Sequence, residues 1–306
     1  METSILLIYK GGILAAETSS LSRSDCVLTI SCQDGPGIVY AISKFLVEND
    51  CNIVESQQFG DRIAGKFFMR VQFEPLSSSG LDVECLRDDF AAVATPFQMS
   101  WRLSVASEKP RVLIMVSKVG HCLNDLLFRS TTGVLHAEIP AIVSNHPDLG
   151  TLAENYGIPF YHLPVTESTK SVAESMLIQL VEDFKIDLVV LARYMQIFSA
   201  DLCAYLEGKA INIHHSVLPS FKGARPYHQA HHRGVKLIGA TAHYVTPDLD
   251  EGPIIEQEVA RVDHSMTAEE VTALGRDTES LALAHAVRWH IENRVLLNGT
   301  RTVVFR

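Results

Sequence analysis

The second half of the chain alternates short strands with helices, and this pattern limits the possible folds more than any other feature of the sequence. Apolar runs rich in β-branched residues are separated by helical stretches such as residues 171–185. Such alternation needs a parallel sheet. We therefore expect an α/β domain with a mostly parallel sheet, whose strands lie at residues 111–117, 141–146, 158–164, 186–193 and 209–215.

Beyond these strands the sequence predicts a β-ribbon, a long helix and a terminal hairpin. The ribbon spans residues 237–262, with two strands facing each other across an acidic loop. Thr267 and Glu270 form a capping box, which marks the start of the long helix. A type I′ turn suits Asn298-Gly299, so the last residues are expected to form a hairpin.

The strand at residues 209–215 ends in polar side chains. Because strand side chains alternate between faces, Asn212 and His214 point one way while Ile211 and Ile213 point the other. In open α/β sheets, ligands bind beyond the carboxyl ends of the strands. An amide donor and an imidazole at such an end predict a reaction centre.

A carboxylate is expected to join this pair from the acidic loop, which carries Asp248, Asp250 and Glu251. The amide of Asn212 can donate to a developing oxyanion, and a carboxylate with the imidazole of His214 can shuttle protons. A solvated turn is the other interpretation of such a loop. Its position beside the histidine strand favours the reaction centre.

The first half of the chain has a different element order. Its βαββαβ order is that of ferredoxin-like folds, and residues 107–110 read as a linker. We expect a flexible extension over residues 1–24, one domain over 25–106 and a second domain over 111–306. The elements of the first domain are predicted at residues 26–32, 38–50, 52–59, 65–74, 80–94 and 100–107.

The turn after the first of these strands resembles the opening of ACT domains, which are small regulatory modules that usually pair across subunits. Gly35 and Gly37 let backbone amides approach an anion at a helix N-terminus. Gly35 is a departure, because many ACT turns carry a larger residue there, and an ordinary strand-to-helix turn is the alternative. The resemblance implies a regulatory ligand at Asp34, Gly35, Gly37 and Ile38.

Charge and composition limit the classes of partner that the protein can be expected to bind. A net charge of −10 argues against a nucleic-acid partner, and no apolar run approaches the roughly 20 residues that span a bilayer. The six cysteines are scattered without CxxC pairs, which is typical of reduced thiols in an intracellular protein. We therefore expect a cytoplasmic protein without a membrane partner, although the N-terminal extension leaves organellar import open.

Three segments of the second half are similar to the folate-dependent formyltransferase and formyl-hydrolase superfamily, namely residues 191–199, 211–230 and 239–257. The resemblance implies a Rossmann-like domain of the formyltransferase type. The superfamily's catalytic signature is matched by Asn212, His214 and Asp250. It also implies a pterin pocket, with substrate contacts at Arg193, Tyr194, Met195, Gln196, Ile197, His121 and His243.

Within the superfamily, the chain is most similar to the formyltetrahydrofolate deformylases, which carry an ACT-like domain in front. Glycinamide ribonucleotide transformylases cradle a phosphate with a Gly-rich loop, whereas residues 117–127 lack the glycine pair and offer His121. Methionyl-tRNA formyltransferases carry a basic C-terminal domain, whereas here a helix and a hairpin follow the acidic loop.

This resemblance implies hydrolysis of 10-formyltetrahydrofolate to formate and tetrahydrofolate, which supplies formate for purine synthesis and balances one-carbon folate pools. It implies no cofactor, a homo-oligomer formed through the ACT-like domain, and an amino-acid effector, glycine or methionine. Two alternatives remain open: a formyltransferase with an amine acceptor, and a catalytically silent amino-acid-sensing protein.

Several histidines lie close together in the sequence, which raises the question of a metal site. No Cys or carboxylate completes a ligand set at the usual spacing, so we expect no metal. His243 is expected to form a hydrogen bond near Asp250, and His215 to pack under the loop. The histidines concerned are His214, His215, His228, His231, His232 and His243.

Overall fold

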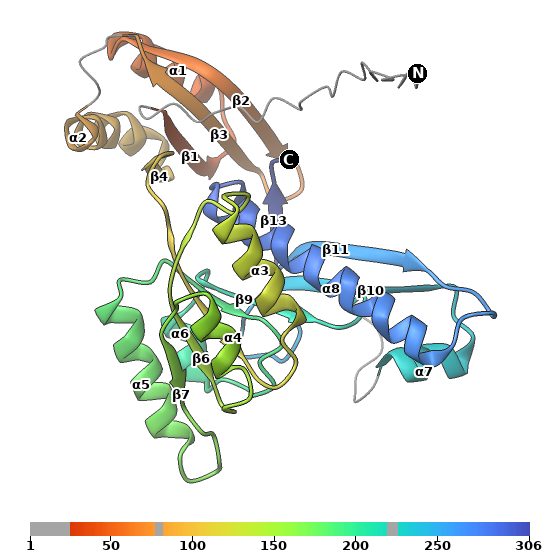
Figure 1. Ribbon diagram of the computed structural model, residues 1–306. Coiled ribbons are helices and arrows are strands. Elements are labelled where there is room, and N and C mark those ends of the chain that lie inside the picture. Colours follow the sequence, from red (N-terminus) through yellow and green to blue (C-terminus); the bar gives the residue numbers. More distant parts are fainter. Residues whose placement is uncertain (1–24, 77–81, 219–225) are drawn as a thin grey trace, which may run out of the picture.

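The computed structural model describes residues 25–76, 82–218 and 226–306, which fold around two separate large sheets (Figure 1). The extension predicted for residues 1–24 and part of the loop after the histidine strand, residues 219–225, lie outside the described residues. Among the helices that are described, none is both long and apolar enough to cross a membrane.

The N-terminal part has the predicted βαββαβ order. Its elements are β1 (Cys26–Gln33), α1 (Ile38–Glu48), β2 (Cys51–Asp61), β3 (Lys66–Pro75), α2 (Val83–Ala94), the short helix η1 (Thr95–Phe97) and β4 (Ser100–Val105). The strands stand in the order β2-β3-β1-β4, and neighbouring strands run antiparallel. The predicted start of the second helix, at residue 80, lies outside the described residues.

The two faces of this sheet meet different partners, which follows from the alternation of side chains along β3. Met69 and Phe73 pack with the apolar residues of α1 and α2 in one core. Arg70 and Gln72 point the opposite way and are buried as well. Arg70 Nε donates to the carbonyl of Glu292 at 3.3 Å, so the helix-free face of the sheet contacts the second domain.

The second sheet has seven strands in the order β11-β10-β9-β8-β5-β6-β7. The parallel strands are β5 (Arg111–Val116), β6 (Glu138–Ser144), β7 (Phe160–His162), β8 (Leu188–Leu191) and β9 (Ala210–His214). The ribbon of β10 (Leu237–Tyr244) and β11 (Ile254–Arg261) is antiparallel. The predicted α/β class, the mostly parallel sheet and the ribbon are confirmed.

Helices cover both faces of this sheet. Apolar side chains of α3 (His121–Thr131), α4 (Gly150–Asn155) and α8 (Ala268–Ile291) share one core, and those of α5 (Lys170–Asp183) and α6 (Ala200–Tyr205) share the other. The central strands are therefore apolar on both faces. The capping box of Thr267 and Glu270 is present at the start of α8. A smaller helix, α7 (Pro226–Arg233), packs on the N-terminal half of α8.

The chain order switches between β5 and β8, and ligands bind at such points in open α/β sheets. From β5 the chain moves outward to β6 and β7, and then returns to β8 on the other side of β5. The backbone N–H of Ser117, after β5, donates to the carbonyl of Arg193 at 3.3 Å. β8 ends at Leu191, two residues before the predicted end, because Arg193 takes a positive φ of 66° and starts a loop.

The terminal hairpin of β12 (Val295–Asn298) and β13 (Arg301–Val304) is present, but the predicted type I′ turn at Asn298-Gly299 is wrong. Asn298 pairs with Arg301, so the two loop residues are Gly299 and Thr300. Only Gly299 of these two has a positive φ, which is the pattern of a type II′ turn. The Asn298 side chain instead donates to Asp61 of the first domain at 2.7 Å.

Candidate active site

The strand pairing of β9 and β10 places the first site residues. Asn212 lies opposite His243, and His214 lies opposite Thr241. The Asn212 Nδ2 and His243 Nε2 atoms are 3.3 Å apart. The structure therefore brings together two residues that the sequence had placed on different strands, at the carboxyl end of β9.

Asp250 completes the predicted trio. Its Oδ1 lies 3.1 Å from Nδ1 of His214 and 3.8 Å from Nε2 of His243. The side chains of His214 and Asp250 are only 7% and 15% exposed, so little water screens the pair. The hydrogen bond from His214 lowers the pKa of the Asp250 carboxyl, and it outweighs burial, which acts in the opposite direction. Asp250 is therefore an ionised base held against an imidazole.

The loop reaches this position through a close backbone approach. A Cβ on Gly252 would lie 1.8 Å from the carbonyl oxygen of Tyr244, so only glycine fits there. The backbone N–H of Tyr244 also donates to the carbonyl of Pro253 in this loop, at 3.0 Å. Asp250 itself has a φ of 59°, a left-handed conformation that Asp adopts more readily than most non-glycine residues.

His243 has a defined tautomer, which orients Asn212. Burial lowers the pKa of His243, so the ring is neutral. Its Nδ1 lies 2.8 Å from the carbonyl of Tyr244, which can only accept, so Nδ1 carries the proton. Nε2 is then an acceptor, and the Asn212 amide must turn its N–H group toward it. The second N–H of the same amide is available to a substrate oxygen.

The other nitrogen of His214 faces no partner in the part of the chain that the structure describes. Its Nε2 is buried and makes no hydrogen bond with any described residue. Buried polar atoms are normally paired, and exceptions of this kind occur at ligand sites. The Nε2 atom thus offers a hydrogen bond to a reacting group.

A cavity of about 310 Å³ adjoins these side chains. Asn212, His214, His243 and Asp250 form one wall, and the predicted pterin loop forms another with Arg193, Tyr194, Met195, Gln196 and Ile197. Met195 and Ile197 are 60% and 59% exposed and line the cavity, so their apolar side chains are accessible to a ring bound there. Tyr194 packs with Phe198 inside the protein, and burial raises its pKa to about 12.

Two polar residues that hold this loop escaped the sequence analysis. Ser117 accepts the backbone N–H of Met195 at 2.9 Å and donates to Asn145 at 2.7 Å. Glu279 of α8, only 1% exposed, lies 3.3 Å from Nε of Arg193. A charged residue on the buried face of a helix was the signal that would have identified Glu279.

Glu279 connects four elements. Its oxygens contact His121 Nε2 at 2.8 Å and accept the Tyr227 hydroxyl at 2.6 Å, in addition to the Arg193 contact. Burial acts to raise the pKa of the Glu279 carboxyl, but His121, Arg193 and Tyr227 together hold it below its usual range. Arg193 in turn contacts Nδ1 of His215, whose ring stacks on His214 with centroids 5.0 Å apart.

This network changes the interpretation of His121 and His215. His121 is not among the residues that line the cavity, and it reaches the pterin loop only through Glu279. His215 was expected to pack under the acidic loop; it stacks on His214, contacts Arg193 and lines the cavity. His121, Cys122 and Glu279 also place three potential metal-ligand atoms within 4.8 Å. Burial raises the pKa of Cys122, however, and Arg193 already neutralises Glu279, so this cluster is better suited to an ion pair than to a metal.

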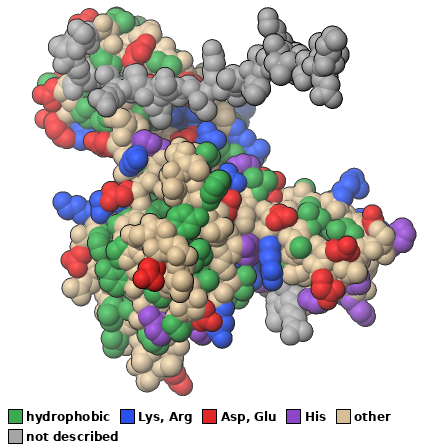
Figure 2. Space-filling model, viewed as in Figure 1, with side chains coloured by type: hydrophobic (Ala, Val, Ile, Leu, Met, Phe, Trp, Pro, Cys, Tyr) green, Lys and Arg blue, Asp and Glu red, His purple; other side chains and the backbone are tan. Residues whose placement is uncertain are grey.

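The remaining predicted residues lie apart from the cavity. Figure 2 shows histidines on the surface over α7, where His228, His231 and His232 are exposed. In the first domain, Asp34, Gly35 and Gly37 are exposed, whereas Ile38 is buried in the core. Gly37 has a φ of 90°, so the turn requires glycine there. A regulatory ligand at this turn stays a prediction.

The chain is similar to known proteins of one family. Residues 110–287 match the formyl transferase family model. A formyltetrahydrofolate deformylase from Corynebacterium sp. strain P-1 is 53% identical over 280 residues, which are 92% of this chain and 98% of the relative. The solved deformylase structure from Burkholderia mallei superposes with a TM-score of 0.89, at 51% identity, over 92% of this chain and 100% of that one.

A transferase relative matches less of the chain. The solved phosphoribosylglycinamide formyltransferase from Anaplasma phagocytophilum superposes with a TM-score of 0.59 at 30% identity, over 64% of this chain and 95% of that one. The match to the deformylases thus extends over nearly the whole chain, whereas the match to the transferase covers only a part of it. The chain belongs to the formyl transferase family and, within it, to the formyltetrahydrofolate deformylases.

Proposed function

We propose that this chain hydrolyses 10-formyltetrahydrofolate to formate and tetrahydrofolate. The observation that carries the proposal is the 3.1 Å pair of His214 and Asp250 beside Asn212, on the wall of a cavity with exposed Met195 and Ile197. The names of the relatives support the same substrate. Its formate product would serve purine synthesis and one-carbon balance, in the cytoplasm.

The trio has the parts that hydrolysis of a formamide requires. Asp250 accepts a proton from water as the oxygen bonds to the formyl carbon. The second N–H of Asn212 and an N–H at Nε2 of His214 donate to the oxyanion. When the oxyanion collapses, the C–N bond breaks and the folate nitrogen takes the proton that Asp250 removed from water, so tetrahydrofolate leaves. The other water proton leaves with formic acid, which releases it to solvent and becomes formate.

The test is turnover without an acceptor amine. Pure protein incubated with 10-formyltetrahydrofolate should release formate and tetrahydrofolate in equal amounts, because water is the nucleophile. A formyltransferase would need glycinamide ribonucleotide or charged tRNA, and a silent sensor would release nothing with either. Turnover that depends on an added amine would overturn the hydrolase assignment.

The N-terminal domain is proposed to pair across subunits through β2. Among the described strands of its sheet, this 11-residue strand stands at an edge, and its Val54 and Phe59 are 52% and 47% exposed. Long apolar edges pair readily with another strand, and a lysine blocks such pairing. Val54→Lys with Phe59→Lys should reduce the mass in light scattering to that of a monomer, whereas Ile63→Lys, at an exposed turn, should not. An unchanged mass in the double variant would contradict the pairing.

The same domain is proposed to bind an amino-acid effector, glycine or methionine, at the turn of Asp34, Gly35, Gly37 and Ile38. The exposed glycines leave backbone amides open to a carboxylate. Hydrolysis rates measured with and without each amino acid test the idea. Identical rates in both conditions would exclude these effectors.

A further inference from the structure

A second cavity, of about 330 Å³, lies where the two domains meet and is as large as the one beside the trio. One wall is the helix-free face of the first sheet, which contributes Gln72 and Arg102. The opposite wall is the end of α8 and the segment that joins the domains, including Pro110. The cavity takes no part in the hydrolysis described above.

The lining of this cavity is strongly basic in a chain whose net charge is −10. Three carboxylates also line it, from Glu108, Asp187 and Glu292. Asp187 is already engaged, because it accepts the backbone N–H of Arg111 at 2.8 Å. The cationic residues of the lining outnumber these carboxylates two to one: Arg70, Arg87, Arg102, Lys109, Arg288 and Arg294.

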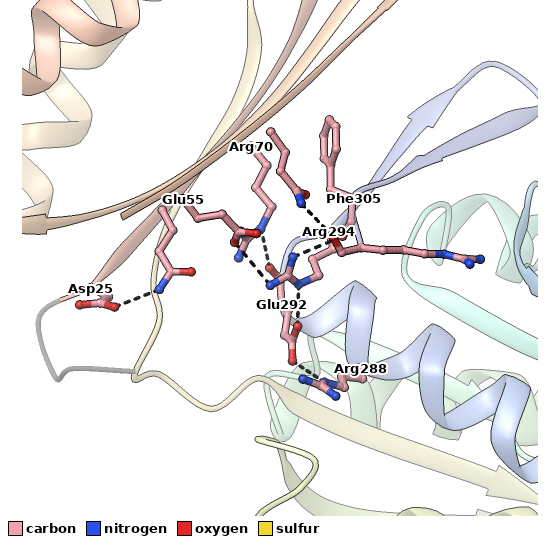
Figure 3. A network of polar contacts seen from close by, with 10 residues as sticks. Asp25, Glu55, Arg70, Arg288, Glu292, Arg294 and Phe305 are labelled. Carbon is pink, nitrogen blue, oxygen red and sulfur yellow. Dashed lines mark hydrogen bonds and ion pairs between the residues drawn. The ribbon is translucent and has the colours of Figure 1, made fainter. Parts of the chain in front are cut away.

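The carboxylates nearest the cavity are shared among several guanidinium groups, as Figure 3 shows. Glu292 contacts Arg288 and Arg294 at 2.7 Å each. Glu55, behind the wall, lies 2.7 Å from Arg70 and 3.5 Å from Arg294. Two carboxylates therefore serve three guanidinium groups. Burial, and next the charge of Arg294, lower the pKa of Arg70, which reflects the excess of positive charge.

Two further cations line the cavity without an ion-pair partner among the described residues. Arg102, from β4, and Lys109, from the joining segment, form no ion pair with a described residue. Both are exposed, so they flank an opening that solutes can enter. Guanidinium groups bind carboxylates and phosphates through paired hydrogen bonds, and an ammonium adds a point charge.

We propose that this cavity binds a small anion with at least two negative charges, of the phosphate or the polycarboxylate class. Its volume lies within the range of small-ligand sites. An anion here would contact Arg102 of the first domain and Lys109 and Arg288 near the second. Binding would therefore hold the two domains together.

Isothermal titration of the full-length protein with pyrophosphate and with citrate tests the proposal. These probes have similar charge, so the tighter of the two assigns the class. Arg102→Glu with Lys109→Glu should weaken binding at least about tenfold, because two charged contacts become repulsive. Arg62→Glu with Lys66→Glu changes the charge of the same domain equally, at exposed sites outside the cavity, and should leave affinity unchanged.

Thermal unfolding with the same probes gives a second readout. Each anion that binds should raise the Tm of the wild-type protein. The same anion should raise the Tm of the Arg102→Gln, Lys109→Gln double variant by less, because this variant removes the two charges without reversing them. The proposal is overturned if neither anion binds at about 10 mM, or if the cavity variants and the control variant bind equally well.

Discussion

Asp250 and His214 are the two residues whose positions say most about the chemistry of the site. A buried ion pair contributes to catalysis only if its members face the reacting group, and here Asn212 and the unpaired Nε2 of His214 share that face. The strand end marked Asn212 and His214 in the sequence, whereas the acidic loop offered three carboxylates, and the resemblance to the formyltransferases singled out Asp250. The sequence did not predict the tautomer of His243, since that depends on the carbonyl of Tyr244 lying 2.8 Å away.

Asp250→Asn should lower kcat by about 100- to 1,000-fold, because the variant loses both the base and the charge that holds His214. KM should stay within a few-fold, since the pterin loop is unchanged. Glu251→Gln, the neighbouring exposed acid, should be nearly silent. Steady-state kinetics measure both variants, and equal losses would mean that the catalytic carboxylate lies elsewhere.

The pH profile tests the same carboxylate. The pKa of Asp250 is lowered in the folded protein, so the ionised base persists as the pH falls past its usual carboxyl range. Activity on the acid side should decline only below that range. A decline centred above the usual carboxyl range would show that another group, and not Asp250, controls the acid limb.

At the scale of elements, the network around Glu279 explains how separate segments hold one loop. α8 supplies Glu279, α3 supplies His121, α7 supplies Tyr227, and the loop after β8 supplies Arg193. The capping box of Thr267 and Glu270 predicted where α8 begins, because both side chains bond the backbone of the first turn. The sequence did not predict this network, because partners from four elements meet only once the fold has formed.

Glu279→Gln should destabilise the protein by about 3 to 5 kcal/mol, because it leaves the Arg193 charge uncompensated inside the protein. KM should rise as well, since Arg193 begins the pterin loop. Tyr227→Phe removes one hydrogen bond to the same carboxylate and should cost about 1.5 to 3 kcal/mol. Glu269→Gln, exposed in the first turn of α8, is the control, with an expected cost below about 1 kcal/mol. Urea unfolding measures all three, and equal costs would contradict the network.

At the scale of the whole molecule, the C-terminal hairpin joins the two domains. Asp61, at the end of β2, accepts backbone N–H groups of Ile63 and Ala64 through Oδ1. Its Oδ2 accepts Asn298 Nδ2 at 2.7 Å and Arg301 at 3.0 Å, both from the hairpin. The domain order was readable from the sequence. This contact was not readable from the sequence. It exists because the strand register places Asn298 in β12 rather than in the turn, so its side chain can reach Asp61.

The last prediction concerns the acid stability of this contact. The backbone N–H of Ala64, followed by Asn298, lowers the pKa of Asp61 in the folded protein. A lowered carboxyl pKa contributes stability that is present above the unfolded-state value and is lost as the pH falls through the folded-state value. Asp61→Asn should therefore be less stable than the wild type at neutral pH, and the two should converge in strong acid.

Hydrogen exchange separates this contact from ordinary acid effects. Asp61→Asn should speed exchange at the amides of β12 and β13 at neutral pH, because the hairpin loses its charged partner. Asp263→Asn is the matched control: its pKa is also lowered, but by hydrogen bonds from Ser265, two residues away. That control should change acid stability without changing exchange in the hairpin. Equal exchange in both variants would mean that the hairpin is held by its apolar contacts alone, and that the charge of Asp61 does not join the domains.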